Sequence, residues 1–304
     1  MSNEKRKVLM KAEHLQKYFP IKKSSIFQKR QEYVKANKDI SLEIYEGETL
    51  GLVGESGCGK STFGRTLIQL YEQTGGASLY YGESIEEMMP EYVRDVYRSI
   101  PKVFPKHEED LKNLKAKEEA LVGKEGEEYL DLSEEYRLAR IEYEENYSNL
   151  FRLAGALLLS DDLNKVRDLL LKKYEQGKVV SKHRARYNHE KLRHEMQHDL
   201  DTKVLDEYKA KLDEAQLKLD AVNEEVEAYR QTLKNNPLYE EYEAQRDDGI
   251  DLSSLNKKEM RTLRKDLQII FQDPYSSLDP RFTVGNIIGE GLIAHKLFDD
   301  PKSE

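Results

Sequence analysis

The chain has 304 residues, of which 35% are charged, and a formal net charge of −9 at pH 7. This acidic balance argues against sequence-independent binding to nucleic acid, because such binding needs clustered Lys and Arg. The single cysteine, Cys58, excludes a disulfide framework and any multi-cysteine zinc module, and it indicates a reduced, cytosolic chain. No apolar run reaches the ~18 residues needed to cross a bilayer, so a membrane role would have to come through a partner.

Residues 8–48 predict strands and turns. Near the end of this segment Ile40, Leu42 and Ile44 alternate with polar residues, which is the period of a half-buried strand. Glu46 and Gly47 then predict a turn. We expect an antiparallel edge that leads into an α/β core.

The next segment, Gly54–Ser61, reads GESGCGKS and fits the phosphate-loop pattern GxxxxGK[ST] at every fixed position. The residues before it, Thr49–Val53, predict a short buried strand, and Lys60–Leu70 predict a helix. That order of strand, loop and helix favours a phosphate loop over a glycine-rich turn. The sequence therefore predicts binding of a nucleoside triphosphate.

Each residue type in this loop has a chemical use. The three glycines let successive backbone N–H groups and the helix N-terminus point at phosphates. Lys60 would reach the β and γ phosphates, and Ser61 would bind Mg²⁺. The predicted nucleotide-binding residues of the loop are Gly54, Glu55, Ser56, Gly57, Cys58, Gly59, Lys60, Ser61 and Thr62.

Residues 74–85 predict a turn and a strand, after which the composition changes. Between positions 83 and 248 lie 40 of the 58 acidic residues but only 28 of the 49 basic ones, in a Gly-poor, helix-favouring stretch. Two heptad seams run through it, one from Tyr129 to Leu150 and one from Leu205 to Leu233. They predict an antiparallel helical hairpin, either a projecting coiled coil or part of a compact bundle.

The same stretch carries HExxH at positions 194–198. On a helix this pattern places His194 and His198 on one face with Glu195 beside them, as in zinc peptidases. Charged neighbours such as Lys191 and Asp199 favour a solvated helix instead, and spacing indicates no third ligand. We expect at most adventitious surface metal binding.

Near the end of the chain, Leu267–Phe271 predict a buried strand that ends in Gln272. A glutamine that leaves a core strand can coordinate Mg²⁺ or the attacking water, so Lys60 and Gln272 are the candidate catalytic residues, and Ser61 and Gln272 the candidate metal ligands.

Together, residues 47–65 and 257–290 resemble the ATP-binding subunit of oligopeptide and dipeptide ABC importers. The resemblance implies a P-loop α/β core of the ABC type, with the loop as Walker A, Gln272 as the Q-loop glutamine and Phe19 stacking on adenine. The implied organisation is an N-terminal part over residues 1–82, a mostly α-helical, partly coiled-coil insert over 83–248, and a continuation over 249–304. ATP and Mg²⁺ are the implied cofactors.

The resemblance also implies partners and a location. Transmembrane permease subunits would contact the segment after Gln272, and a second ABC ATPase subunit would complete the nucleotide site. The chain would then lie in the cytoplasm, peripherally on the inner face of the cell membrane. We expect no nucleic-acid partner.

The sequence departs from the family pattern in two respects. The helical insert stands where the family has a short connector, and no LSGGQ signature, Walker B or H-loop histidine follows Gln272. We therefore expect an ABC core that is incomplete at its C-terminus and hydrolyses little ATP alone. The chain would pair with a separately encoded C-terminal half or be a truncated product.

Two other function classes fit parts of the sequence. One is a non-hydrolytic ATP-binding scaffold whose insert docks a partner. The other is a chromosome-maintenance or repair ATPase with a coiled coil in its head. In that second class the Q-loop precedes the coil, whereas Gln272 follows it here. Order therefore favours the importer.

Overall fold

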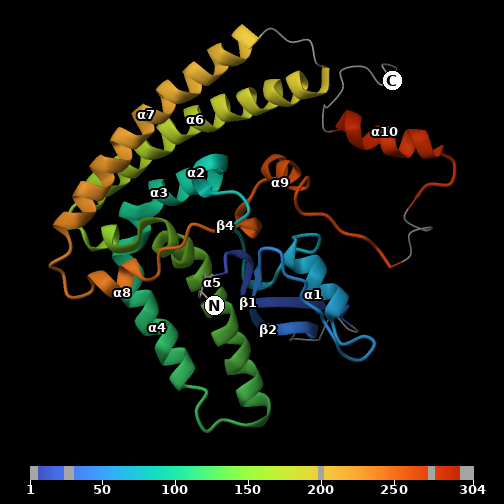
Figure 1. Cartoon of the computed structure of the whole chain (residues 1–304). Coiled ribbons are helices and arrows are strands. Elements are labelled where there is room, and N and C mark those ends of the chain that lie inside the picture. Colours follow the sequence, from blue (N-terminus) through green and yellow to red (C-terminus); the bar gives the residue numbers. More distant parts are fainter. Residues whose placement is uncertain (1–5, 24–30, 198–201, 273–277, 295–304) are drawn as a thin grey trace, which may run out of the picture.

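The computed structural model describes residues 6–23, 31–197, 202–272 and 278–294. Figure 1 shows a small sheet with helix α1 beside it, and a larger assembly of helices built from the middle of the chain. The mixed sheet and helix content agrees with the class predicted from the sequence.

The four strands pair only antiparallel, in the order β2-β1-β3-β4. Leu15 on the central strand is fully buried, while Ile40, Leu42 and Ile44 on β2 pack against the core with one face, as their alternation predicts. The predicted antiparallel edge and the strand after α1 are therefore confirmed. The strands are β1 (Val8–Pro20), β2 (Tyr33–Tyr45), β3 (Gly75–Tyr80) and β4 (Ile250–Asp251).

Helices fill the predicted insert and continue beyond it. Within the described ranges, 3₁₀ segments link them at Phe104–Lys106, Gly155–Leu159 and Leu252–Ser254. The α-helices are α1 (Lys60–Leu67), α2 (Ile85–Met88), α3 (Glu91–Val103), α4 (His107–Glu119), α5 (Gly126–Ala154), α6 (Leu163–Gln197), α7 (Thr202–Thr232), α8 (Tyr239–Glu243), α9 (Lys257–Leu263) and α10 (Val284–Ala294).

One hydrophobic core joins the sheet to the helices. It runs from β1 and α1 through α3, α5, α6 and α7 to β4, so the sheet and these helices are packed together. Its most completely buried members are Ile100, Leu150, Leu157, Leu158 and Ile250. The helices are thus held on the sheet by shared apolar burial, the dominant favourable contribution to folding.

The long helical hairpin is formed by a different pair of helices from the pair predicted. The seam on α7 packs against α6, with Leu219 and Ala215 buried beside Val180, and not against the 129–150 seam. The described ends of α6 and α7, Gln197 and Thr202, are only a few residues apart, so these helices are antiparallel neighbours (Figure 1). Helix α5 instead packs on α3 and α4.

Two predicted strands do not form. Residues 49–53 and 267–271 form no ladder with the described strands, and Val53 and Ile270 are each 94% exposed. A buried strand needs neighbours on both edges and cover on its faces, and the described strands supply neither to these two segments. The predicted α/β core is therefore represented here by an antiparallel sheet.

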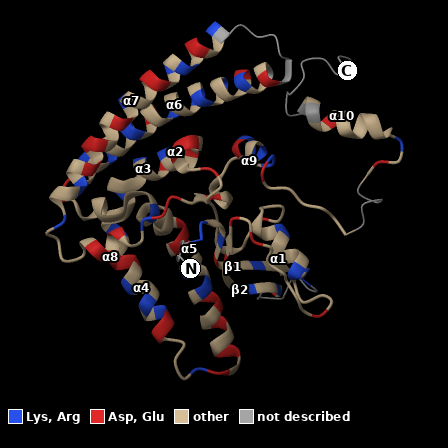
Figure 2. Ribbon diagram, viewed as in Figure 1, with Lys and Arg blue, Asp and Glu red and all other residues tan. Residues whose placement is uncertain are grey.

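Charged residues are interspersed along α4, α5, α6 and α7 (Figure 2). Some join neighbouring helices, as where Lys172 Nζ lies 2.5 Å from Glu225 Oε2 between α6 and α7. Such exposed pairs contribute little to stability, so packing holds the hairpin. Among the described helices none combines the length and apolarity required to cross a membrane.

Candidate nucleotide-binding site

The loop before α1 has the backbone of a phosphate loop. Gly54, Gly57 and Gly59 have φ angles of 153°, 81° and 97°. Gly59 is the N-cap of α1, no side chain caps the helix, and no acidic residue lies in its first turn. The N-terminal N–H groups and the positive end of the helix dipole are therefore left for an anion.

Strand β2 fixes the position of this loop. An added Cβ at Gly59 would lie 2.4 Å from the Ala36 carbonyl oxygen, and Asn37 Nδ2 donates to the Gly59 carbonyl at 3.4 Å. Asn37 itself is 5% exposed. Only glycine fits against the strand at this point. The supporting residues Ala36 and Asn37 were not predicted, because nothing in a strand pattern marks which residues touch a loop.

The Lys60 side chain folds back over the loop that precedes α1. Its Nζ donates to the carbonyl oxygens of Gly54 at 2.7 Å and Glu55 at 2.6 Å. Ser61 is exposed beside it, while Phe63 on the opposite face of α1 is 3% exposed and anchors the helix in the core. The polar side chains that the motif requires are thus on the accessible face of α1.

Two of the residues before Gln272 lie against α1 or the residues that follow it. Arg264 donates to the carbonyl oxygens of Ile68 at 2.7 Å and Gln69 at 3.1 Å, just beyond the end of α1. The Arg65 guanidinium lies 5.9 Å from the Phe271 ring centroid. Gln272 is exposed, and no hydrogen bond among the described residues joins it to Lys60 or Ser61. Its predicted role as a metal ligand stays a prediction.

Phe19 lies near the end of β1 and is half-buried. Its ring packs edge-on against Tyr71 at 5.8 Å, and Lys17 Nζ is 4.9 Å from its centroid. The neighbouring Tyr18 is 6% exposed and belongs to the core. Of the two aromatic residues, Phe19 is the more accessible, and its predicted stacking on adenine remains untested.

The HExxH pattern falls at the end of α6. His194 and Glu195 lie in its final turns, whereas His198 is outside the described residues. Across the described ranges, no group of three or more His, Cys, Asp or Glu residues is arranged to hold a metal ion.

Comparisons with known proteins find matches in sequence. The profile of the ABC transporter family matches residues 37–242, which include the whole phosphate loop and most of the helical region. The oligopeptide transport ATP-binding protein AppF of Bacillus subtilis is 43% identical over 105 residues, 34% of this chain and 32% of its own. The oligopeptide transport ATP-binding protein OppF of Escherichia coli is 42% identical over 102 residues, 33% of this chain and 30% of its own.

A dipeptide transport ATP-binding protein, DppF of Lactococcus lactis, is 49% identical over 67 residues, 21% of each chain. The chain therefore spans about a third or less of the length of these curated relatives. No solved structure matches the chain.

Proposed function

The chain belongs to the ABC transporter family, and we propose that it is the ATP-binding part of an importer of oligopeptides or dipeptides. The observation that carries this proposal is the uncapped N-terminus of α1 preceded by a loop whose glycines adopt left-handed backbone. That arrangement is a binding site for the phosphates of a nucleotide.

The loop fits ATP in shape and in charge. At Gly54 and Gly59 an added Cβ would meet neighbouring atoms at 2.8 and 2.4 Å, so the backbone can curl only without side chains there. Entering phosphate oxygens would replace the Gly54 and Glu55 carbonyls as acceptors from Lys60 Nζ. Mg²⁺ prefers oxygen ligands, which Ser61 and Gln272 would supply. Bound ATP brings the phosphoanhydride bond whose cleavage drives transport.

The proposal includes a polypeptide partner that completes the nucleotide-binding core. Leu50, Leu52 and Val53 beside the loop are 42%, 44% and 94% exposed, and Ile269, Ile270 and Phe271 are 37%, 94% and 44% exposed. Apolar strand-like segments of this kind are ready to pair with further strands. We assign this role to further polypeptide of the ABC nucleotide-binding core, which would also carry the groups needed for fast hydrolysis.

Further partners follow from the same assignment. A second ABC ATPase subunit would close over the nucleotide, and permease subunits would contact the segment after Gln272. Phe282, Val284 and Ile288 in or beside α10 are 54%, 73% and 63% exposed and offer apolar contact area there. These partners would hold the protein on the cytoplasmic face of the membrane.

Nucleotide binding is the first test. A fluorescent ATP analogue titrated into the purified chain with Mg²⁺ should bind, and Lys60→Ala should weaken binding about 10- to 100-fold through loss of a charge-assisted contact. Lys218→Ala is the matched control, because it removes a lysine of α7 whose side chain is 62% exposed. This variant should bind the analogue as the wild type does. Equal affinity of Lys60→Ala and wild type would contradict the proposal.

Completion of the site is the second test. The chain alone should hydrolyse ATP slowly, and a polypeptide that begins with the family signature and includes Walker B should raise the rate when mixed with it. A transport-ATPase rate from the chain alone would overturn the split-site part of the proposal and leave ATP binding intact. No rate increase with any such polypeptide would favour the non-hydrolytic scaffold.

A further inference from the structure

Aromatic rings and cations alternate along one row, from the end of β1 past the last turn of α1 to the segment before Gln272. In spatial order its members are Lys17, Phe19, Tyr71, Arg65 and Phe271. The first four are half-buried, and Phe271 is 44% exposed. Contacts between cations and ring faces are favourable at such positions, so neighbours in the row hold one another in place.

Strand register places Phe19 close to the phosphate loop. Phe19 pairs with Val34 on β2. Ala36, two residues further along β2, has the carbonyl oxygen that an added Cβ at Gly59 would meet at 2.4 Å. Two residues of a strand cover about 7 Å. This distance is of the same order as the separation that a ribose makes between a base and its first phosphate, so Phe19 lies where a nucleotide held by the loop carries its base.

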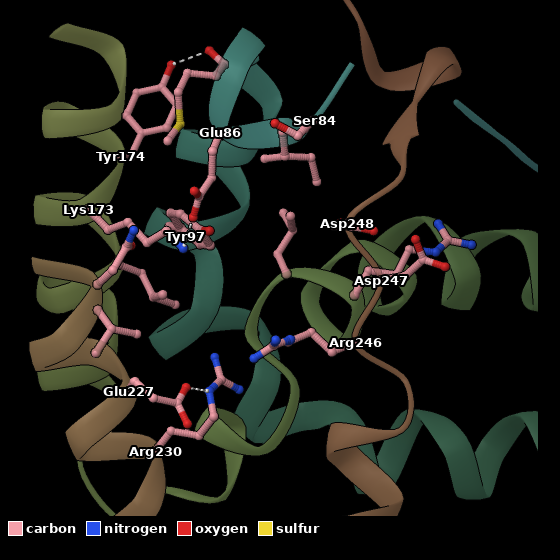
Figure 3. Close-up of a pocket in the computed structure, with 17 residues that line it drawn as sticks. Ser84, Glu86, Tyr97, Lys173, Tyr174, Glu227, Arg230, Arg246, Asp247 and Asp248 are labelled. Atoms are coloured by element: carbon pink, nitrogen blue, oxygen red, sulfur yellow. Dashed lines mark hydrogen bonds and ion pairs between the residues drawn. The ribbon is translucent and has the colours of Figure 1, made fainter. Parts of the chain in front are cut away.

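The cavity of about 710 Å³ between α2, α3, α6 and α7 has no part in this arrangement (Figure 3). Neither the phosphate loop nor any member of the row lines it. Its charged walls are paired with one another, as where Arg230 lies 2.7 Å from Glu243 and 3.4 Å from Glu227. A base attached to phosphates in the loop would therefore lie against β1 and not in this cavity.

Tyr71 holds the Phe19 ring in place. The two ring centroids are 5.8 Å apart and the ring planes meet at 89°, which is a favourable edge-to-face contact. Lys17 adds a second tie, because its Nζ lies 4.9 Å from the Phe19 centroid and donates to the carbonyl oxygen of Glu72 at 2.6 Å. A half-buried ring can otherwise change its rotamer. The orientation of Phe19 thus depends on the residues that follow α1.

Arg65, in the last turn of α1, fixes Tyr71. Its Nη1 donates to the Tyr71 hydroxyl at 3.0 Å, and its carbonyl oxygen accepts from the Tyr71 backbone N–H at 3.2 Å. Its guanidinium lies 5.6 Å from the Tyr71 centroid and 5.9 Å from that of Phe271. Because α1 begins at the phosphate loop, Tyr71 is tied to the same helix whose N-terminus faces the phosphates.

We propose that Tyr71 and Arg65 are positioning residues for the base of the bound nucleotide. They hold Phe19 in the orientation in which its ring stacks on the base, and α1 sets the place of that ring relative to the phosphate loop. This role rests on the proposed function, since it takes the loop as the site of the ATP phosphates. Tyr71 and Arg65 act on the base and not on the triphosphate, so a ligand without a base should not sense them.

Calorimetric titration of the purified chain with ATP and with inorganic tripolyphosphate, each with Mg²⁺, tests this role. Tyr71→Leu should weaken ATP binding about 3- to 10-fold, the range of one edge-to-face ring contact, and leave tripolyphosphate affinity unchanged. Tyr71→Phe keeps the ring but loses the hydroxyl, so its ATP affinity should lie between those of the wild type and Tyr71→Leu. Tyr129→Leu, at a 43% exposed tyrosine of α5, is the matched control and should bind both ligands as the wild type does.

A double-mutant cycle tests the link from Arg65 to Tyr71. Arg65→Lys keeps the charge but not the planar donor, so it should lose about as much ATP affinity as Tyr71→Phe. The double variant should lose no more than either single one, because both remove the same contact, and additive losses would overturn the role of Arg65.

The two ligands separate failure of this role from failure of the proposed function. Equal losses for ATP and tripolyphosphate in Tyr71→Leu and Tyr71→Phe, or no loss of ATP affinity in either, would overturn the positioning role while ATP binding stands. A wild-type chain that binds neither ligand would contradict the proposed function itself. Melting temperatures verify folding, and Tyr71→Phe, the milder change, decides the result if Tyr71→Leu does not fold.

Discussion

The helices between residues 85 and 243 and the segments around the nucleotide site are packed very differently. In the helical region Ile100 and Leu158 are 0% and 2% exposed, within a core that also includes the sheet. Beside the site, Val53 and Ile270 are each 94% exposed although both belong to strongly apolar stretches. The helical region has a buried apolar core, although it also exposes side chains such as Val122 and Leu217, whereas Val53 and Ile270 beside the site are not packed.

This contrast separates what stabilises the fold from what binds the nucleotide. The phosphate loop is held by backbone conformation, by β2 and by the buried face of α1, and not by the apolar residues that precede it. Stability and nucleotide affinity should therefore respond to different substitutions. Segments 49–53 and 267–271 should become stabilising only when other strands cover them.

The largest expected effect is on stability, from a substitution in the helical core. Ile100→Ala should lower the free energy of unfolding by about 2–5 kcal/mol, because it removes buried methyl groups and leaves a cavity. Ile270→Ala, the same change at a 94% exposed position, should change it by less than about 0.5 kcal/mol. Urea denaturation of the two variants measures both values. Similar losses would mean that Ile270 is packed in solution and that the contrast between the regions is wrong.

The second effect concerns the backbone of the loop. Gly59→Ala should cost about 2–3 kcal/mol and weaken ATP binding, because a Cβ at φ 97° would lie 2.4 Å from the Ala36 carbonyl oxygen. Gly57→Ala is the matched change, since its φ is 81° but nothing lies within 4 Å of the added Cβ. It should cost only about 1 kcal/mol of left-handed strain. If both variants behaved alike, contact with β2 would not position the loop.

The sequence predicted local structure better than contacts between distant segments. The phosphate loop, α1 and β3 follow from residues within a few positions of one another, and each was found. Heptad spacing on α7 shows which face is apolar but not which helix covers it, so α5 was predicted where α6 lies. An apolar run such as 267–271 predicts a strand, but the strand forms only where neighbouring strands can pair with it. No sequence pattern predicts the contact between Gly59 and Ala36.

A smaller effect is expected where the Gln272 segment joins α1. Arg264 donates to two carbonyl oxygens beyond the end of that helix, and Arg264→Ala should cost about 1–2 kcal/mol because both lose a charged donor. It should also reduce any effect of Gln272→Ala on Mg²⁺-dependent nucleotide affinity, since the segment would no longer be fixed. Arg264→Lys keeps the charge but not the forked donor and is the control. Its unfolding free energy should lie between those of the wild type and Arg264→Ala. Additive effects of Arg264→Ala and Gln272→Ala would show that Arg264 does not position Gln272.

The smallest effect is a pH dependence within the helical region. His107 is 8% exposed, its Nε2 lies 2.8 Å from the Tyr143 hydroxyl, and burial lowers its pKa against the opposing influence of Glu108 and Asp110. Below about pH 6.5 the unfolded chain therefore binds a proton that the folded chain does not, so stability should fall as the pH falls, by at most about 1.4 kcal/mol per pH unit.

His107→Phe keeps a ring against Phe104 and removes the titration, so its unfolding free energy should change less between pH 7 and pH 5.5. His189→Gln, an exposed histidine on α6, should retain the wild-type dependence. Nδ1 of His107 is buried with no hydrogen-bond partner among the described residues, so His107→Phe should cost little stability at pH 7. An equally steep loss of stability toward pH 5.5 in His107→Phe would show that His107 does not cause the response to acid.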